Sequence, residues 1–326
     1  MAGGQERVLR RRIRSIQSTK KITRAMELIA ASRIVKAQQA ILAARPYVEK
    51  MAEVVADLAR TPDAAGSPLF GGHGDSDGPG GTAVIAVTAD RGLAGAYNSS
   101  VLRGVERLVA ERRRRGGDVM LVTSGRKAES FFRFRGEEVA RSVTGVSERP
   151  TFEAARQMVE TVMGAIRAGE VGEVQLVFTR FLSMGSQAVT TRRLVPLDVT
   201  PPDGAADGPA PAEHRFVDYE YEPDPAAILD LLLPRWLEAE VYAALLEGAA
   251  SEQAARQRAM KAATDNADDL ATTLTRVMNR ARQDTITTEI MEIVGGAEAL
   301  RGGSPEGGSW KELYLPPDDA RAATGP

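Results

Sequence analysis

Apolar residues recur at helical spacing near the start of the chain. The stretch 14–59 holds almost no helix-breaking residue, and from Ile34 to Leu58 its apolar positions alternate spacings of three and four. That spacing is typical of a supercoiled helix pair. Pro46 lies off this seam and predicts a mild bend, because it removes a hydrogen bond to the carbonyl of Leu42.

A second helical stretch lies near the other end, from Arg235 to Leu300. It contains no proline, and Gly248 is its only interior glycine before Gly295. Its apolar positions form two stripes in shifted phase, one of Leu270, Leu274, Val277 and Ala281, the other of Ile286, Ile290, Ile293, Ala297 and Leu300. A single helix cannot bury its own stripe, so we expect the two terminal helices to pair antiparallel.

Short apolar strands alternate with amphipathic helices between these two stretches. We expect strands over 82–88, 118–124, 173–183 and 186–197, and helices over 99–117, 125–136 and 151–169. This order predicts a small, largely parallel sheet, with the last two strands forming a hairpin around 184–186. The expected fold class is α/β: a long antiparallel coiled coil of N- and C-terminal helices plus a small Rossmann-like α/β domain.

The same patterns divide the chain into segments. We expect a first helix over 1–60, a Gly/Pro-rich loop over 61–81 and an α/β domain over 82–222 that carries a flexible insertion at 200–214. A C-terminal helix over 223–300 and a flexible extension over 301–326 complete the division.

Composition excludes several kinds of chemistry. The chain has no cysteine, so it forms no disulfide, thiolate metal site or cysteine nucleophile. Both histidines, His73 and His214, lie in the Gly/Pro-rich loops, where we expect neither a metal site nor a general base, and we expect no cofactor. The net charge of −2 gives no reason to expect a nucleic-acid partner. The absence of a long apolar run, and of the apolar core of a signal peptide at the N-terminus, predicts a cytoplasmic or peripheral protein without a transmembrane span.

Two features suggest other functions. The stretch "VTADRGLAGAYNSS" (87–100) carries Gly92 and Gly95 where an α/β sheet often cradles phosphate, but its spacing matches neither the dinucleotide fingerprint nor the P-loop. A tight turn that packs against a neighbour is the favoured reading, and a phosphate-binding enzyme is the alternative. Residues 7–33 carry nine basic side chains, which is consistent with a solvated helix face. The other alternative is a coiled-coil scaffold or a nucleic-acid-binding rod, although this stretch lacks the interleaved aromatic residues of a nucleic-acid-binding arm.

Three blocks of the sequence resemble the gamma subunit of F-type ATP synthase. They are "RSIQSTKKITRAMELIAASRIVKAQ", "ADRGLAGAYNSSV" and "ASEQAARQRAMKAATDNADDL…NRARQDTITTEIMEIVGGAEAL". They follow the family's order, and the resemblance covers most of residues 1–300.

The resemblance implies a central-stalk rotor subunit without a catalytic site of its own. In the family, the paired terminal helices turn inside a hexamer of alpha and beta subunits, and the α/β domain joins epsilon and the c-ring. Proton flow through the c-ring is thereby coupled to conformational cycling of the catalytic beta subunits. The resemblance further implies one copy per complex, no nucleic-acid partner, and a peripheral position on the cytoplasmic face of the bacterial cell membrane.

Residue roles follow from the matching motifs. Rotor–stator coupling contacts are implied at Met26, Arg256, Gln283, Thr287, Glu289 and Glu292. Contacts of the foot with epsilon and the c-ring are implied at Tyr219, Glu220, Tyr221 and Glu222. Beta subunits of the family present acidic loops, which gives the basic first helix a partner. Residues 256–285 favour small and polar side chains over aromatics, as a surface that must turn without sticking requires.

Overall fold

The computed structural model describes residues 2–59, 80–197 and 225–301. They divide into two compact units, one from residues 1–18 and 267–326 and the other from residues 19–266. The elements in chain order are α1 (Ala2–Ala59), β1 (Gly81–Val87), α2 (Tyr97–Arg114), β2 (Val119–Ser124), α3 (Arg126–Phe134), β3 (Val139–Val143), α4 (Phe152–Arg167), β4 (Val171–Phe181), β5 (Gln187–Val195) and α5 (Pro225–Arg301).

A five-stranded sheet forms the centre of the larger unit. Its strand order is β3-β2-β1-β4-β5, with the first four strands parallel and β5 antiparallel to β4. The expected hairpin of β4 and β5 is therefore confirmed, and so is the largely parallel sheet. The order reverses between β1 and β4, because α2 leads to β2 on one side of β1 and α4 leads to β4 on the other side.

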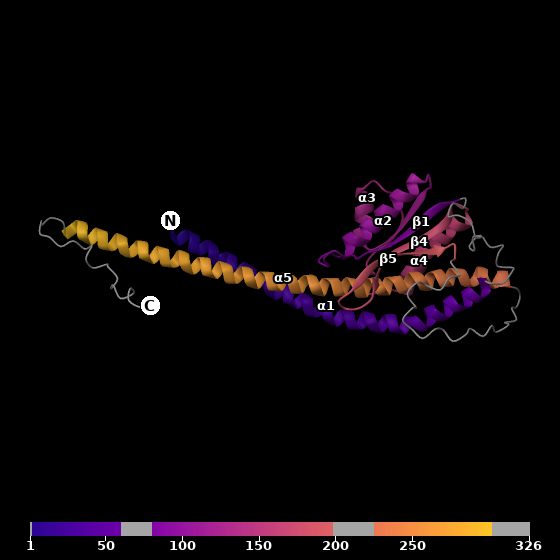
Figure 1. The fold of residues 1–326 in the computed structure, drawn as a ribbon, viewed down its shortest axis with the longest axis horizontal. Helices are drawn as coiled ribbons and strands as arrows, with labels where there is room; N and C mark the ends of the chain where they lie inside the picture. Colours follow the sequence, from indigo (N-terminus) through magenta and orange to yellow (C-terminus); the bar gives the residue numbers. More distant parts are fainter. Residues whose placement is uncertain (1, 60–79, 198–224, 302–326) are drawn as a thin grey trace, which may run out of the picture. The chain divides into compact units, whose positions relative to one another are not determined.

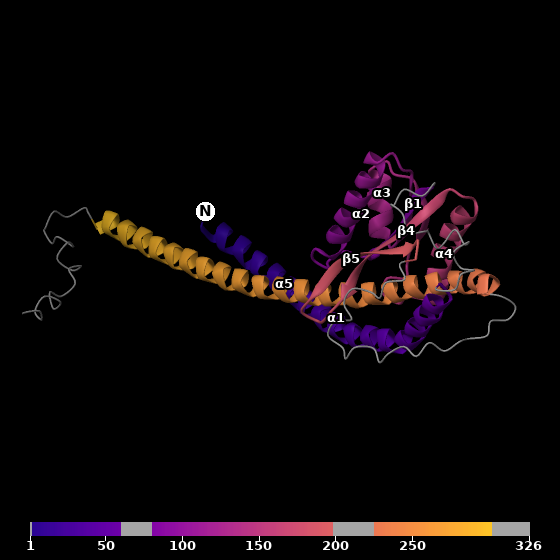
Figure 2. The same ribbon diagram turned by 45° about the vertical axis from the view of Figure 1, so that its right-hand side comes forward.

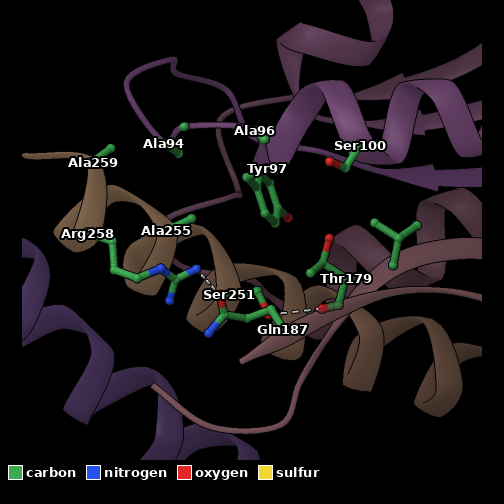
Figure 3. Close-up of a pocket in the computed structure, with 12 residues that line it drawn as sticks. Ala94, Ala96, Tyr97, Ser100, Thr179, Gln187, Ser251, Ala255, Arg258 and Ala259 are labelled. Atoms are coloured by element: carbon green, nitrogen blue, oxygen red, sulfur yellow. Dashed lines mark hydrogen bonds between the residues drawn. The ribbon is translucent and has the colours of Figure 1, made fainter. Parts of the chain in front are cut away.

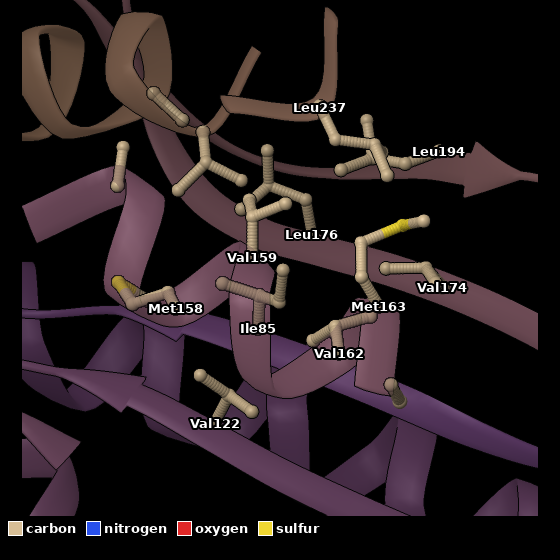
Figure 4. Close-up of a cluster of buried hydrophobic side chains, with 14 of the residues drawn as sticks. Ile85, Val122, Met158, Val159, Val162, Met163, Val174, Leu176, Leu194 and Leu237 are labelled. Carbon is tan, nitrogen blue, oxygen red and sulfur yellow. The ribbon is translucent and has the colours of Figure 1, made fainter. Parts of the chain in front are cut away.

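Helices cover both faces of this sheet (Figure 1). On one face, Val84 of β1 and Val177 of β4 pack with Val101 of α2 and Phe132 of α3. On the other face, the side chains of α4 interlock with β1, β4 and β5, and Leu237 of α5 joins the same core (Figure 4). Strands β1, β2 and β4 are largely apolar because both of their faces are buried, as is typical of parallel strands.

The terminal helices pair antiparallel within the larger unit. Thr23 of α1 and Thr264 of α5 share a hydrogen bond of 2.7 Å between their hydroxyl oxygens. At the other end of the pairing, Val55 of α1 lies in one core cluster with Leu233 and Leu237 of α5. Figures 1 and 2 both show the two helices side by side here. The expected antiparallel pairing is confirmed, and every residue of the predicted seam from Ile34 to Leu58 is buried or half-buried.

The smaller unit buries far less. Ile13 of α1 and Ala267 and Ala271 of α5 are the only described residues in it that are less than a tenth exposed. The first apolar stripe predicted on α5 is covered in part: Leu274 and Ala281 are half-buried, whereas Leu270 and Val277 are each 45% exposed. The second stripe is left uncovered, because Ile286 and Ile290 are 44% and 54% exposed and every residue from 291 to 300 is exposed. Pairing with α1 therefore does not account for the second stripe.

The structure adds one element that was not expected from the sequence, strand β3. Helix α5 also extends before the proline-free stretch that begins at Arg235, so that Pro234 lies in its interior. Almost all of the predicted loop 61–81, the insertion 200–214 and the extension beyond residue 301 lie outside the described residues, as do both histidines.

Candidate functional site

Met26 lies on the part of α1 that pairs with α5. It is half-buried between the buried residues Thr23, Glu27 and Ala30, which follow helical spacing toward α5. Thr23 also contacts the Lys20 carbonyl at 3.0 Å, and Thr264 donates to the Met260 carbonyl at 2.9 Å. These two contacts lie within α1 and within α5; the Thr23–Thr264 hydrogen bond joins the two helices near the level of Met26.

Apolar side chains on two sides of α1 near Met26 are without cover from the described residues. Ile22 and Ile29, which lie beside Met26 at helical spacing, are 58% and 53% exposed, and Leu28, on roughly the opposite side, is 58% exposed. Arg24, next to them, is held by Glu27, whose two carboxylate oxygens each accept from its Nη1 at 2.9 Å. This part of α1 therefore exposes apolar groups on two sides, one of them next to a basic group, which is typical of a protein contact surface.

The other coupling residues implied by the family lie near the end of α5. Gln283, Thr287, Glu289 and Glu292 are all exposed in the smaller unit. At about 100° per residue, Gln283 and Thr287 share one side of the helix, whereas Glu289 and Glu292 lie on roughly the opposite side. The structure therefore does not gather these four residues into one patch. It distributes them around a helix that is exposed on all sides.

Arg256 differs from the other implied coupling residues because it is buried, at 7% exposed. Its Nη2 donates to Glu252 at 2.5 Å and to the carbonyl of Gly92 at 3.2 Å. Burial raises the pKa of the Glu252 carboxyl, and the charge of Arg256 offsets only part of that effect. The Arg256 Nη1 and Glu252 Oε2 atoms have no hydrogen-bond partner among the described residues. Within this chain, Arg256 ties α5 to the loop that follows β1.

That loop, residues 88–96, is organised by a carboxylate. Asp90 accepts from the backbone N–H groups of Gly145 at 2.9 Å, Ser147 at 3.1 Å and Arg126 at 3.2 Å. Burial raises the pKa of Asp90, but these hydrogen bonds outweigh it and hold the pKa below its ordinary value. The Asp90 carboxylate thus occupies the backbone N–H of Arg126, the first residue of α3, which a bound phosphate would otherwise contact.

The loop also packs directly on α5. Ala94 and Tyr97 form a small cluster with Ala89 and Ala255. Gly95 has a positive φ of 55° and approaches Ala259, so the turn needs a glycine for its backbone conformation. These contacts support the tight-turn reading of "VTADRGLAGAYNSS" over a phosphate cradle.

Sequence reasoning missed the polar residues that hold this arrangement together, chiefly Asp90, Ser147 and Glu252. A usable signal existed for one pair, because Glu252 and Arg256 are four residues apart in an alanine-rich stretch. The implied foot contacts Tyr219, Glu220, Tyr221 and Glu222 lie outside the described residues. Among the residues that the structure describes, there is no metal-binding group of His, Cys, Asp or Glu, and no helix long and apolar enough to cross a membrane.

The family model and the similar proteins agree in their descriptions. A family model described as ATP synthase matches residues 5–300. An "ATP synthase gamma chain" from a Parafrankia species is 48% identical over 92% of this chain and 99% of its own length. The protein of the same name from Mycolicibacterium smegmatis is 47% identical over 91% of this chain and 98% of its own length.

Solved structures share the fold. A chain of the Euglena gracilis mitochondrial ATP synthase, from a structure of OSCP, F1 and c-ring, matches with a TM-score of 0.62 and 17% identity over 94% of this chain and 98% of its own. A chain from the central stalk and c-ring of the Tetrahymena thermophila enzyme matches with a TM-score of 0.54 and 23% identity, over 74% of this chain and 99% of its own.

Proposed function

Because this chain belongs to the ATP synthase gamma chain family, we propose that it is the central-stalk rotor subunit of a bacterial ATP synthase. In this role it couples proton flow through the c-ring to conformational cycling of the catalytic beta subunits. It performs no bond chemistry itself; its surface presents different contacts to each beta subunit as it turns. Such differential contacts shift the conformational equilibrium of the partner, which is the physical content of the coupling.

The uncovered apolar surface at the end of α5 is the observation that supports this proposal most directly. Ile286, Ile290, Ile293 and Leu300 lie on one side of the helix and are between 44% and 90% exposed. Contiguous exposed apolar side chains mark an interaction surface in a soluble protein. A ring of subunits that encloses the helix would cover this stripe and would also meet Glu289 and Glu292 on other sides.

We assign the residue roles as follows. Met26 on α1 and Gln283, Thr287, Glu289 and Glu292 on α5 contact the alpha and beta subunits during rotation. Arg256 contributes to coupling by holding α5 to the α/β domain through Glu252 and Gly92. Tyr219, Glu220, Tyr221 and Glu222 contact epsilon and the c-ring. One copy is present per complex, peripheral on the cytoplasmic face of the membrane.

Torque transfer demands that the α/β domain not slip against the terminal helices. Between Trp236 and Gln253 of α5 almost every residue is buried, and Leu237 and Trp236 enter the main core. Arg192 of β5 forms an ion pair with Glu240 at 2.5 Å, and Phe181 donates its N–H to Glu247 at 3.0 Å. Strands β4 and β5 are therefore joined to α5 by apolar packing and by polar bonds.

The test begins with a pull-down from native membranes through a tag inserted at Gly72. We expect alpha, beta, epsilon and c subunits to co-purify with ATPase activity that a proton-channel inhibitor blocks. The same preparation, reconstituted in vesicles, should pump protons when given ATP. Recovery of the chain alone, or with nucleic acid instead of these subunits, would show that the family fold serves another function here.

A further inference from the structure

A hollow of about 420 Å³ opens at the carboxyl ends of β1 and β4. Its walls come from three parts of the larger unit: the turn Ala94–Tyr97 with the start of α2, the strands β4 and β5, and α5 (Figure 3). This is the place where the strand order of the sheet reverses. In open α/β sheets, ligands bind in the crevice at such a reversal.

Two buried hydroxyl groups face this space. Thr179 is 5% exposed, and its Oγ1 is a buried atom without a hydrogen-bond partner among the described residues. Figure 3 shows the hydroxyl groups of Tyr97 and Thr179 pointing toward each other into the hollow. Burial raises the pKa of Tyr97, so its hydroxyl stays protonated and able to donate. A buried hydroxyl without a partner is unfavourable unless something in the hollow bonds to it.

The charge of the lining selects the kind of ligand. Arg258 is its one ionised side chain, and no carboxylate lines the hollow. The Arg258 guanidinium is held at the mouth, where it donates to the Met184 carbonyl at 2.7 Å and to Gln187 Oε1. Glu252 acts on Tyr97 from the neighbouring face of α5, but it is paired with Arg256. An anion is therefore favoured over a cation.

The other polar lining residues are largely paired within the chain: Ser251 donates to the Thr179 carbonyl at 3.1 Å, and Gln187 donates to the Ser183 carbonyl and accepts from Arg258. Apart from these two and Ser100, the remaining walls are small and apolar. Ala94, Ala255 and Ala259 provide methyl groups, and Val189 closes the side formed by β5. Such walls suit a flat hydrocarbon body, whereas a sugar or a polyphosphate would leave many polar groups unpaired. We propose that this hollow is a binding site for a small aromatic carboxylate, with the ring against the alanines and the carboxylate accepting from Tyr97 and Thr179.

This site is distinct from a nucleotide cradle and from the rotor contacts. The backbone N–H of Arg126 at the start of α3 already donates to Asp90, and the Gly92 carbonyl is occupied by Arg256. A ligand in the hollow would bridge α5, the β4–β5 pair and the loop after β1. None of the residues assigned above to contacts with other subunits lines it.

The test uses the purified full-length chain and 2-naphthoate as the probe, with 2-naphthamide as a neutral molecule of the same shape. Binding is measured by titration calorimetry and by saturation-transfer NMR. We expect 2-naphthoate to bind at least about tenfold more tightly than 2-naphthamide. Thr179→Val removes the hydroxyl while keeping the side-chain shape, and Arg258→Gln removes the charge; each should weaken 2-naphthoate by roughly fivefold to tenfold.

Two further variants make the outcome decisive. Ala255→Phe fills the hollow and should abolish binding, whereas Lys261→Gln, an exposed change on the same helix outside the hollow, should leave binding unchanged. Circular dichroism and thermal unfolding check that each variant is folded. If Ala255→Phe does not fold, the binding result for Thr179→Val decides the proposal. The proposal is overturned if 2-naphthoate fails to bind at millimolar concentration, binds no better than 2-naphthamide, or binds the Thr179→Val and Arg258→Gln variants as well as it binds the original chain.

Discussion

At the scale of single residues, the ion pair of Glu252 and Arg256 carries a large desolvation cost. Both side chains are removed from water, with the Glu252 side chain 1% and the Arg256 side chain 8% exposed. Burying two charges is expensive, and their attraction compensates only while both partners are present. Removing one partner leaves an uncompensated buried charge, which is worse than removing both.

We predict that Arg256→Gln lowers the free energy of unfolding of the isolated chain by about 3 kcal/mol. The double variant Arg256→Gln with Glu252→Gln should recover a large part of that loss, because no buried charge remains. Urea unfolding of both single variants and the double variant measures the coupling between them. Arg45→Gln breaks an exposed pair with Glu49 and serves as the control, with an expected change below about 0.5 kcal/mol. Strictly additive single changes would contradict the prediction.

Asp90 offers a second residue-scale prediction. We expect Asp90→Asn to lower the free energy of unfolding at pH 7 by about 1–3 kcal/mol, because an amide group would place donors against backbone donors. The exposed change Asp118→Asn is the matched control and should have little effect.

Acid titration provides an independent readout for Asp90. Its folded-state pKa lies below the ordinary value of 3.8, so its stabilisation is fully present above pH 3.8 and is lost as the pH falls through the lower, folded-state pKa. The stability difference between the original chain and Asp90→Asn should therefore shrink in acid. A difference that grows as the pH falls would assign Asp90 another role.

The family motif singles out Arg256 and the spacing of four pairs it with Glu252, but neither shows that the pair is buried, and neither points to Asp90. By charge alone, Asp90 and Arg256 do not stand out in a chain where about a quarter of residues are charged. Their importance comes from burial and from partners up to 164 residues away, as for Arg256 and Gly92. Periodicity reports which side of a helix is apolar, but it carries no information on which charge finds a buried partner across the sheet.

At the scale of elements, α5 approaches the sheet closely because of one glycine. A β-carbon at Gly248 would lie 3.0 Å from Val87 Cγ1 and 3.1 Å from the Tyr97 hydroxyl. Alanine is better than glycine in a helix interior by about 1 kcal/mol, but crowding a packed core costs about 1–3 kcal/mol.

We predict that Gly248→Ala is neutral to destabilising, by up to about 2 kcal/mol, and that Gly248→Val is strongly destabilising. Gly164→Ala in α4 is the control: apart from its own helix backbone, no atom of the described residues lies within 4 Å of its added β-carbon, so helix propensity alone should stabilise the chain by roughly 1 kcal/mol. Thermal unfolding of the three variants measures the contrast. A stabilisation by Gly248→Ala equal to that by Gly164→Ala would mean that α5 is not held closely at this point.

The elements themselves were largely predictable, with one instructive exception. Strands β1, β2 and β4 are apolar runs because they are buried on both faces, and the sequence shows them clearly. Strand β3 is a five-residue edge strand with the sequence "VARSV" and only Val143 buried. An edge strand with one solvent-facing side needs little hydrophobicity, so its pattern does not stand out from a loop.

At the scale of the whole molecule, stability and function depend on different surfaces. The core of the larger unit determines whether the chain folds, whereas the uncovered stripe of α5 matters only when a partner covers it. Ile290 is 54% exposed, so replacing it should scarcely change the unfolding of the isolated chain.

We predict that Ile290→Ser changes the free energy of unfolding of the isolated chain by less than about 0.5 kcal/mol. In the assembled complex the same substitution should lower the ratio of proton pumping to ATP hydrolysis, because an apolar contact is lost. Val35→Ser, on the exposed side of α1 in the larger unit, is the matched control, because it also replaces an exposed apolar side chain by a hydroxyl group. An unchanged pumping ratio in Ile290→Ser would remove this residue from the contact surface.

The hydrogen bond between Thr23 and Thr264 joins residues that are 241 positions apart. Synthesis at about 5–20 residues per second separates their emergence by roughly 10–50 s. During that interval the apolar side of α1 lacks α5 as its packing partner. The α/β segment between α1 and α5 can already fold, because its contacts are closer in sequence. Ribosome-bound chains that end before α5 should therefore expose α1 to chaperones and proteases. Helix α1 therefore completes its packing only after α5, the last helix to be synthesised, has emerged.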